Sequence, residues 1–84
     1  MHARRVLVID DDKDFAELIK HNLAEAGAIV ETALSAEEGL RLFRERHHDL
    51  VLLDLMMPGM NGWQACRAFR ELSNIPIIVL TALG

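Results

Sequence analysis

Two short apolar runs in this chain each end in aspartate. The run at residues 6–9 leads into the aspartates at 10–12, and the run at 50–53 leads into Asp54. Short runs of this kind, rich in β-branched residues, are typical of strands buried on both faces of a parallel sheet. Because the carboxyl ends of parallel strands meet at one edge, where α/β sheets bind ligands, we expect the acids to lie together there.

A cluster of carboxylates needs compensation. At about 4 Å and an effective dielectric constant near 20, two carboxylates repel each other by roughly 4 kcal/mol. The cluster therefore requires a divalent cation or the uptake of a proton, and Mg²⁺ is the cation we expect. The alternative is that Asp10 and Asp11 only cap the next helix, but one cap suffices. Asp12 is predicted to be that cap.

Length and composition limit the number of domains, the kinds of partner and the cellular location. The chain has 84 residues, 51% of them apolar and 26% charged, and a net charge of −4. We expect one small domain, shorter than the ~100–150 residues of a typical one and therefore partial. The scattered basic residues disfavour direct nucleic-acid binding. A single cysteine, Cys66, fits a reducing compartment, and we expect a cytoplasmic location. No apolar stretch is long enough for a signal peptide or a membrane anchor.

Strand and helix patterns alternate along the chain. Gly27 follows a helical pattern where a left-handed cap would lie, Ser35 begins a capping box, and Asn61 can cap a third helix. The expected elements are strands at about 6–10, 28–32, 50–54 and 77–80, the last one buried, and helices at about 14–26, 36–46 and 62–71.

This alternation predicts a doubly wound α/β fold with a parallel sheet and right-handed crossovers. No glycine-rich phosphate loop follows the first strand, which disfavours nucleotide binding. We expect Trp63, Cys66 and Phe69 to face the core. His47 and His48 are adjacent and lie at a helix end, so they are predicted to be solvated surface residues.

From about residue 5 to 84 the sequence resembles the receiver domain of two-component response regulators. The resemblance lies in three segments, Val-Ile-Asp-Asp-Asp at 8–12, Leu-Leu-Asp-Leu-Met-Met-Pro-Gly-Met-Asn-Gly at 52–62 and Pro-Ile-Ile-Val-Leu-Thr-Ala at 76–82. It implies a flavodoxin-like fold with strand order 2-1-3-4. It also implies a signalling domain rather than an enzyme.

The resemblance also assigns roles to residues. It implies that Asp54 accepts a phosphoryl group from a sensor histidine kinase or a phosphotransfer protein. Asp10, Asp11, Asp54 and the main-chain carbonyl of Met56 would bind Mg²⁺, and Thr81 would be the switch hydroxyl. Met56 and Leu83 occupy the positions that influence hydrolysis in this family, and their apolar side chains imply slow loss of phosphate.

The sequence also departs from the family. The fifth strand with its lysine and the last helices have no counterpart, and the two lysines, Lys13 and Lys20, belong to the region of the first helix. The strand at 77–80 would then be an exposed apolar edge, so we expect the isolated chain to self-associate or to be a piece of a longer receiver. The alternative function is a receiver-like interaction or oligomerisation module that phosphate does not regulate.

Overall fold

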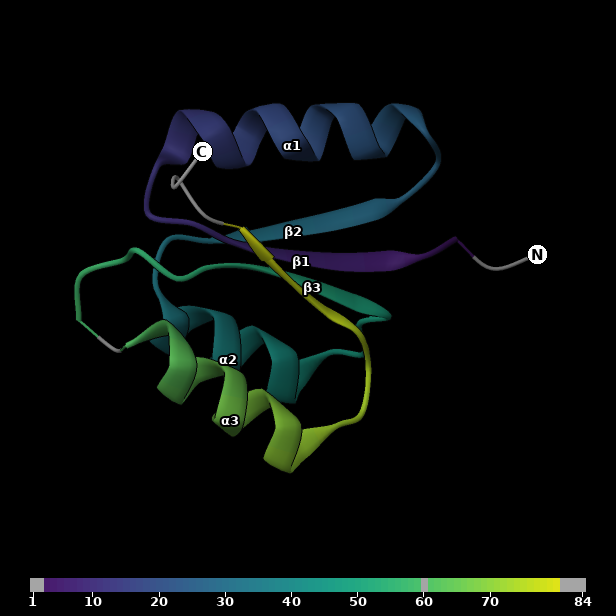
Figure 1. The fold of residues 1–84 in the computed structure, drawn as a ribbon. Coiled ribbons are helices and arrows are strands. Elements are labelled where there is room, and N and C mark those ends of the chain that lie inside the picture. Colours follow the sequence, from purple (N-terminus) through teal and green to yellow (C-terminus); the bar gives the residue numbers. More distant parts are fainter. Residues whose placement is uncertain (1–2, 60, 81–84) are drawn as a thin grey trace.

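Strands and helices alternate in the computed structural model, which describes residues 3–59 and 61–80 (Figure 1). All seven predicted elements are present, with ends within two residues of those expected. The strands are β1 (Arg5–Ile9), β2 (Ile29–Ala33), β3 (Leu50–Asp54) and β4 (Ile77–Leu80), and the helices are α1 (Lys13–Glu25), α2 (Ala36–Glu45) and α3 (Gly62–Leu72).

The four strands form one parallel sheet in the order β2-β1-β3-β4. Helix α1 covers one face, and α2 and α3 cover the other (Figure 1). In the register, Ile9 is paired with Leu53 and Asp54 with Leu80, so three strands end at the same edge. The predicted doubly wound fold and the strand order 2-1-3-4 are confirmed.

The side chains of the sheet divide into two hydrophobic clusters, one on each face. Leu7 and Ile9 of β1 pack with Leu53 and with Phe69 of α3, and every one of these side chains is fully buried. On the α1 face the cluster is smaller and consists of Val6, Val8, Ala16, Val30 and Leu52. Alternation of side chains along β1 therefore supplies both clusters, as expected for a strand buried on both sides.

Each helix begins directly after the cap residue that the sequence indicates. The side chains of Asp12, Ser35 and Asn61 accept hydrogen bonds from main-chain N–H groups in the first turns of α1, α2 and α3. Gly27, just beyond α1, has a φ of 98°, which L-residues with a side chain rarely adopt. No helix in the described ranges is long and apolar enough to cross a membrane.

One predicted core residue of α3 is exposed. Phe69 is fully buried and Cys66 is partly buried against the core, as predicted, but the side chain of Trp63 is 64% exposed. The buried stripe of α3 consists of Gly62, Ala65 and Phe69, whose spacing follows the helical period of 3.6 residues. Trp63 lies outside that stripe, so its prediction as a core residue is wrong.

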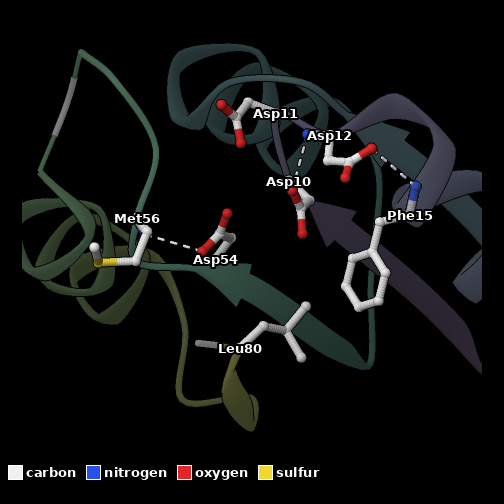
Figure 2. Close-up of a pocket in the computed structure, with 7 residues that line it drawn as sticks. All are labelled: Asp10, Asp11, Asp12, Phe15, Asp54, Met56 and Leu80. Carbon is white, nitrogen blue, oxygen red and sulfur yellow. Dashed lines mark hydrogen bonds between the residues drawn. The ribbon is translucent and has the colours of Figure 1, made fainter. Parts of the chain in front are cut away.

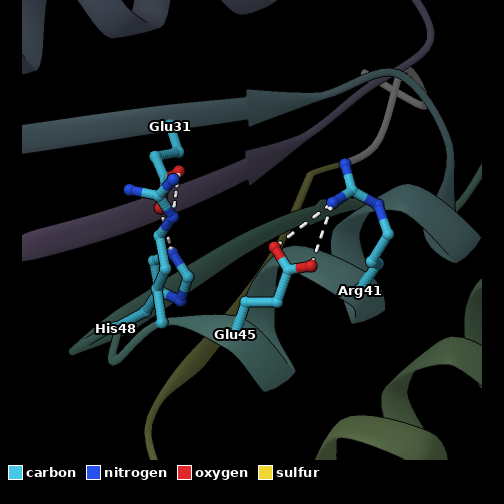
Figure 3. A network of polar contacts seen from close by, with 5 residues as sticks. Glu31, Arg41, Glu45 and His48 are labelled. Atoms are coloured by element: carbon cyan, nitrogen blue, oxygen red, sulfur yellow. Dashed lines mark hydrogen bonds and ion pairs between the residues drawn. The ribbon is translucent and has the colours of Figure 1, made fainter.

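The prediction for His48 is also wrong. Its side chain is 1% exposed, whereas that of its neighbour His47 is 80% exposed, as predicted. The ring of His48 stacks on Phe43 with centroids 5.7 Å apart, and its Nε2 lies 2.8 Å from Oε1 of Glu31 on β2 (Figure 3). Adjacent residues face different ways, and here the second one faces the protein interior.

Strand β4 is not the buried strand that its apolar sequence predicted. Ile78 is 51% exposed and Val79 is 38% exposed, because β4 is at the edge of the sheet. Within the described ranges it pairs with β3 on one side and with no strand on the other. This arrangement agrees with the alternative expectation of an exposed apolar edge.

Candidate functional site

Three acidic side chains meet at the carboxyl edge of the sheet. Asp10 follows β1, Asp11 comes next, and Asp54 ends β3, and one carboxylate oxygen of each lies within 4.8 Å of the other two. They line a pocket of about 510 Å³ (Figure 2). The rest of its described lining comprises Asp12, Phe15, Met56 and Leu80.

The main chain holds Asp10 firmly in this pocket. Its N–H donates to the carbonyl of Ala33, which continues the pairing of β1 with β2 beyond the last residue of the strand. Its side-chain Oδ1 accepts a hydrogen bond from the N–H of Asp12 at 2.9 Å. The residue is 5% exposed, and it lines the pocket.

Asp54 is held in a similar way from the neighbouring strand. Its Oδ1 accepts a hydrogen bond from the N–H of Met56 at 2.9 Å, and within the described ranges Oδ2 accepts none. Gly62 allows α3 to begin close to this loop, since a Cβ there would lie 2.7 Å from the Cα of Leu55. Leu55, the residue directly after β3, is therefore packed against the start of α3.

The other two aspartates of the first loop have different roles. Asp11 is exposed and contributes its carboxylate to the cluster. Asp12 accepts a hydrogen bond from the N–H of Phe15 at 3.2 Å and is the N-cap of α1, as predicted. Capping by Asp12 leaves Asp10 and Asp11 without a role in helix capping, which argues against the capping alternative for these two residues.

The clustering has an electrostatic cost. Burial raises the pKa of the Asp10 carboxyl above its ordinary value, and the charges of Asp54 and Asp11 raise it further. The hydrogen bond from the N–H of Asp12 acts in the opposite direction and favours the ionised form. Ionised Asp10 therefore destabilises the folded chain unless a cation compensates for the neighbouring charges.

The donor set fits a divalent metal ion such as Mg²⁺. Three carboxylates supply hard oxygen ligands on one side of an open pocket, which leaves room for waters and for the oxygens of a second ligand. No cysteine or histidine belongs to this group in the described ranges, which disfavours a zinc site. Met56 lines the same pocket, whereas Thr81 and Leu83 lie outside the described residues.

Three neighbours of the acids were not predicted from the sequence. Phe15 and Leu80 supply apolar lining, and Gly62 provides the close approach of α3. The position of Leu80 at the end of a strand beside Thr81 could have indicated its place at the edge. Nothing in the sequence distinguishes Phe15 from the other apolar residues of α1.

Comparisons with known proteins agree with this geometry. Residues 6–84 match the family model described as "Response regulator receiver domain". The chain is 40% identical over 84 residues to the "Probable transcriptional regulator ycf27" of Cyanophora paradoxa, which covers 100% of this chain and 35% of that protein. It is 43% identical over 77 residues to the transcriptional regulatory protein AfsQ1 of Streptomyces coelicolor, covering 92% and 34% respectively. The chain thus spans about a third of the length of these curated relatives.

Solved structures of response regulators superpose on this chain. The chemotaxis protein CheY4 of Vibrio cholerae superposes with a TM-score of 0.94 at 31% identity, covering 99% of this chain and 72% of that one. The response regulator TrrA of Thermotoga maritima, in complex with Mg²⁺ and BeF, gives a TM-score of 0.89 at 39% identity, covering 96% and 71%. TrrA has also been solved in complex with the histidine kinase ThkA.

Proposed function

Because the chain belongs to the family of response regulator receiver domains, we propose that it accepts a phosphoryl group on Asp54 in a reaction that requires Mg²⁺. The observation that carries this proposal is the meeting of Asp10, Asp11 and Asp54 in one open pocket. The crystallised complexes of TrrA with Mg²⁺ and BeF and with a histidine kinase support the same ion and the same class of partner for this chain.

The proposed reaction is a phosphoryl transfer from a histidine of the kinase or of a phosphotransfer protein. An oxygen of Asp54 bonds to phosphorus, the bond between phosphorus and the donor imidazole nitrogen breaks, and that nitrogen takes up a proton. Oδ2 of Asp54 suits this attack, because Oδ1 accepts the N–H of Met56. A receiver of this kind assists its own modification but is not a metabolic enzyme.

The metal ion would be held by Asp10, Asp11, Asp54 and the main-chain carbonyl of Met56. When bound, it would neutralise the carboxylates and the phosphoryl oxygens that must approach one another. We assign the switch role to Thr81, whose hydroxyl would bond a phosphoryl oxygen of modified Asp54. In support, its neighbour Leu80 is paired with Asp54 in the sheet and lines the pocket.

Intact-mass measurement after incubation with acetyl phosphate and Mg²⁺ tests the proposal. Wild type should gain the mass of one phosphoryl group, and Asp54→Asn should gain none. Asp14→Asn is the matched control, since Asp14 is an exposed acid of α1 outside the pocket lining, and it should be modified like wild type. Equal modification of Asp54→Asn and wild type, or no modification of either, would contradict the proposal.

A second candidate function is favoured by the exposed edge of β4. Ile78 and Val79 present apolar side chains beside an edge that no described strand covers, and such edges pair readily with another strand. A second copy of the chain is the partner we consider, so the function would be oligomerisation without phosphate. Sedimentation velocity separates the candidates: dimers that form equally in wild type and Asp54→Asn would favour this one, and a monomer would exclude it.

A further inference from the structure

One side of the acidic pocket is apolar. Phe15, in the first turn of α1, and Leu80, the last residue of β4, line it together with the carboxylates (Figure 2). Met56 also belongs to the lining, but it is 60% exposed and its side chain points away from Asp54 in Figure 2. Besides Met56, the apolar residues that line the described part of the pocket are Phe15 and Leu80.

Packing alone does not explain the position of Phe15. Its side chain is 42% exposed and belongs to neither hydrophobic cluster, so burial of the ring adds little to the core. Its main chain is nevertheless fixed, because its N–H donates to Oδ1 of the N-cap Asp12. The helix cap thus fixes the main chain of a residue whose aromatic ring lines the pocket.

We propose that Phe15 and Leu80 form a water-excluding wall that slows hydrolysis of the phosphoryl group on Asp54, an inference that rests on the proposed function. In hydrolysis the oxygen of water bonds to phosphorus, the bond from phosphorus to the Asp54 oxygen breaks, and the carboxylate is released. Inorganic phosphate carries away the protons of the water. A phenyl ring and an isobutyl group offer no strong hydrogen-bonding group to orient an attacking water, and they occupy space that water would fill.

The decay of the phosphorylated chain tests this inference. Each variant is modified with acetyl phosphate and Mg²⁺, freed of donor, and followed by intact mass; a small donor avoids contacts with a kinase. Phe15→Ala should lose its phosphoryl group about threefold faster than wild type or more, and Phe15→Gln faster still because its amide can bind water. Phe15→Leu should remain close to wild type, since it keeps an apolar side chain.

Leu18→Ala is the matched control for these variants. Leu18 lies on the same helix, is 55% exposed and is outside the pocket lining, so its removal should leave the decay rate unchanged. The free energy of unfolding of every variant shows whether faster decay reflects a loosened fold, in which case Phe15→Leu and Leu18→Ala would decay faster too.

The experiment distinguishes failure of the proposed wall from failure of the proposed phosphorylation. Wild-type decay rates in both Phe15→Ala and Phe15→Gln would overturn the wall while leaving phosphorylation of Asp54 intact. Equal acceleration in Leu18→Ala would also overturn it. If wild type takes up no phosphoryl group at all, both the proposed function and this inference fail.

Discussion

At the carboxyl edge of the sheet, Asp10 lies against Asp11 and Asp54. At the opposite ends of the strands, where β3 begins, Asp49 lies against groups that favour its charge. Oδ2 of Asp49 accepts the N–H of Arg5 at 2.8 Å, and Oδ1 lies 3.3 Å from Nε2 of His47. The pKa of Asp10 is raised, first by burial and then by its acidic neighbours. The pKa of Asp49 is lowered, mainly by the hydrogen bond from Arg5 and also by His47. Two aspartates of one sheet thus have opposite effects on folding.

A further acid away from the pocket is also paired. Glu31 of β2 lies 2.8 Å from Nε2 of buried His48 through one oxygen and 3.3 Å from Nε of Arg46 through the other (Figure 3). Acids paired with bases stabilise the fold, whereas the acids placed beside other acids at the carboxyl edge make up the metal site that we propose.

The largest effect on stability is expected away from the pocket. His48→Ala opens a cavity beside Phe43 and leaves the partly buried carboxylate of Glu31 without its closest partner, which should lower the free energy of unfolding by about 3 kcal/mol. Urea denaturation measures this loss. His48→Gln keeps an N–H donor and should lose less. A change below about 0.5 kcal/mol in His48→Ala would show that this pair does not stabilise the fold.

At the carboxyl edge, a substitution is expected to raise the free energy of unfolding. Asp10→Asn removes a buried charge beside Asp11 and Asp54 while keeping an oxygen that can accept the N–H of Asp12. Without divalent cations this variant should be more stable than wild type by about 1 kcal/mol. Asp49→Asn, the matched change at the other edge, should be less stable than wild type. Destabilisation by both substitutions would refute the contrast between the two edges.

Acidification should reduce the difference in stability between wild type and each of these two variants, Asp10→Asn and Asp49→Asn. Because the pKa of Asp10 is raised, its carboxyl binds a proton more tightly in the folded chain than in the unfolded chain. The destabilisation by ionised Asp10 is therefore lost as the pH falls from the raised pKa toward about 3.9. Asp49 behaves in reverse, since its contribution exists above about 3.9 and is lost as the pH falls through its lowered folded pKa. Unfolding free energies measured from about pH 7 to 3 in the presence of a chelator test both signs.

The smallest effect is expected for a pair that is exposed. Nη1 of Arg41 lies 3.2 Å from Oε2 of Glu45 one turn later on α2, and both side chains are more than half exposed (Figure 3). Arg41→Ala should change the free energy of unfolding by about 0.5 kcal/mol or less. A loss as large as that of His48→Ala would mean that an exposed ion pair stabilises the fold as much as a buried one.

The sequence predicted the elements and the acids of the site because both follow from local patterns. Apolar runs that end in aspartate place Asp10 and Asp54 at one edge as soon as the strands are parallel, and the cap at Asp12 is a property of one loop. Trp63 was predicted wrongly because its burial depends on how α3 is rotated against the sheet. His48 was predicted wrongly because its burial depends on contacts with Phe43 of α2 and Glu31 of β2, which are distant in the sequence from the loop before β3. Phe15 is a similar case, since its place beside the carboxylates arises from the packing of α1 and has no signature in the sequence.

We propose that the acids at the carboxyl edge lie together because they bind a metal ion. The test is the free energy of unfolding of wild type and Asp10→Asn, measured with Mg²⁺ and with Na⁺ at the same ionic strength. Wild type should gain about 2.7 kcal/mol when free Mg²⁺ is 100 times its dissociation constant, and Asp10→Asn should gain much less. No gain in wild type, or an equal gain in both proteins, would contradict the claim.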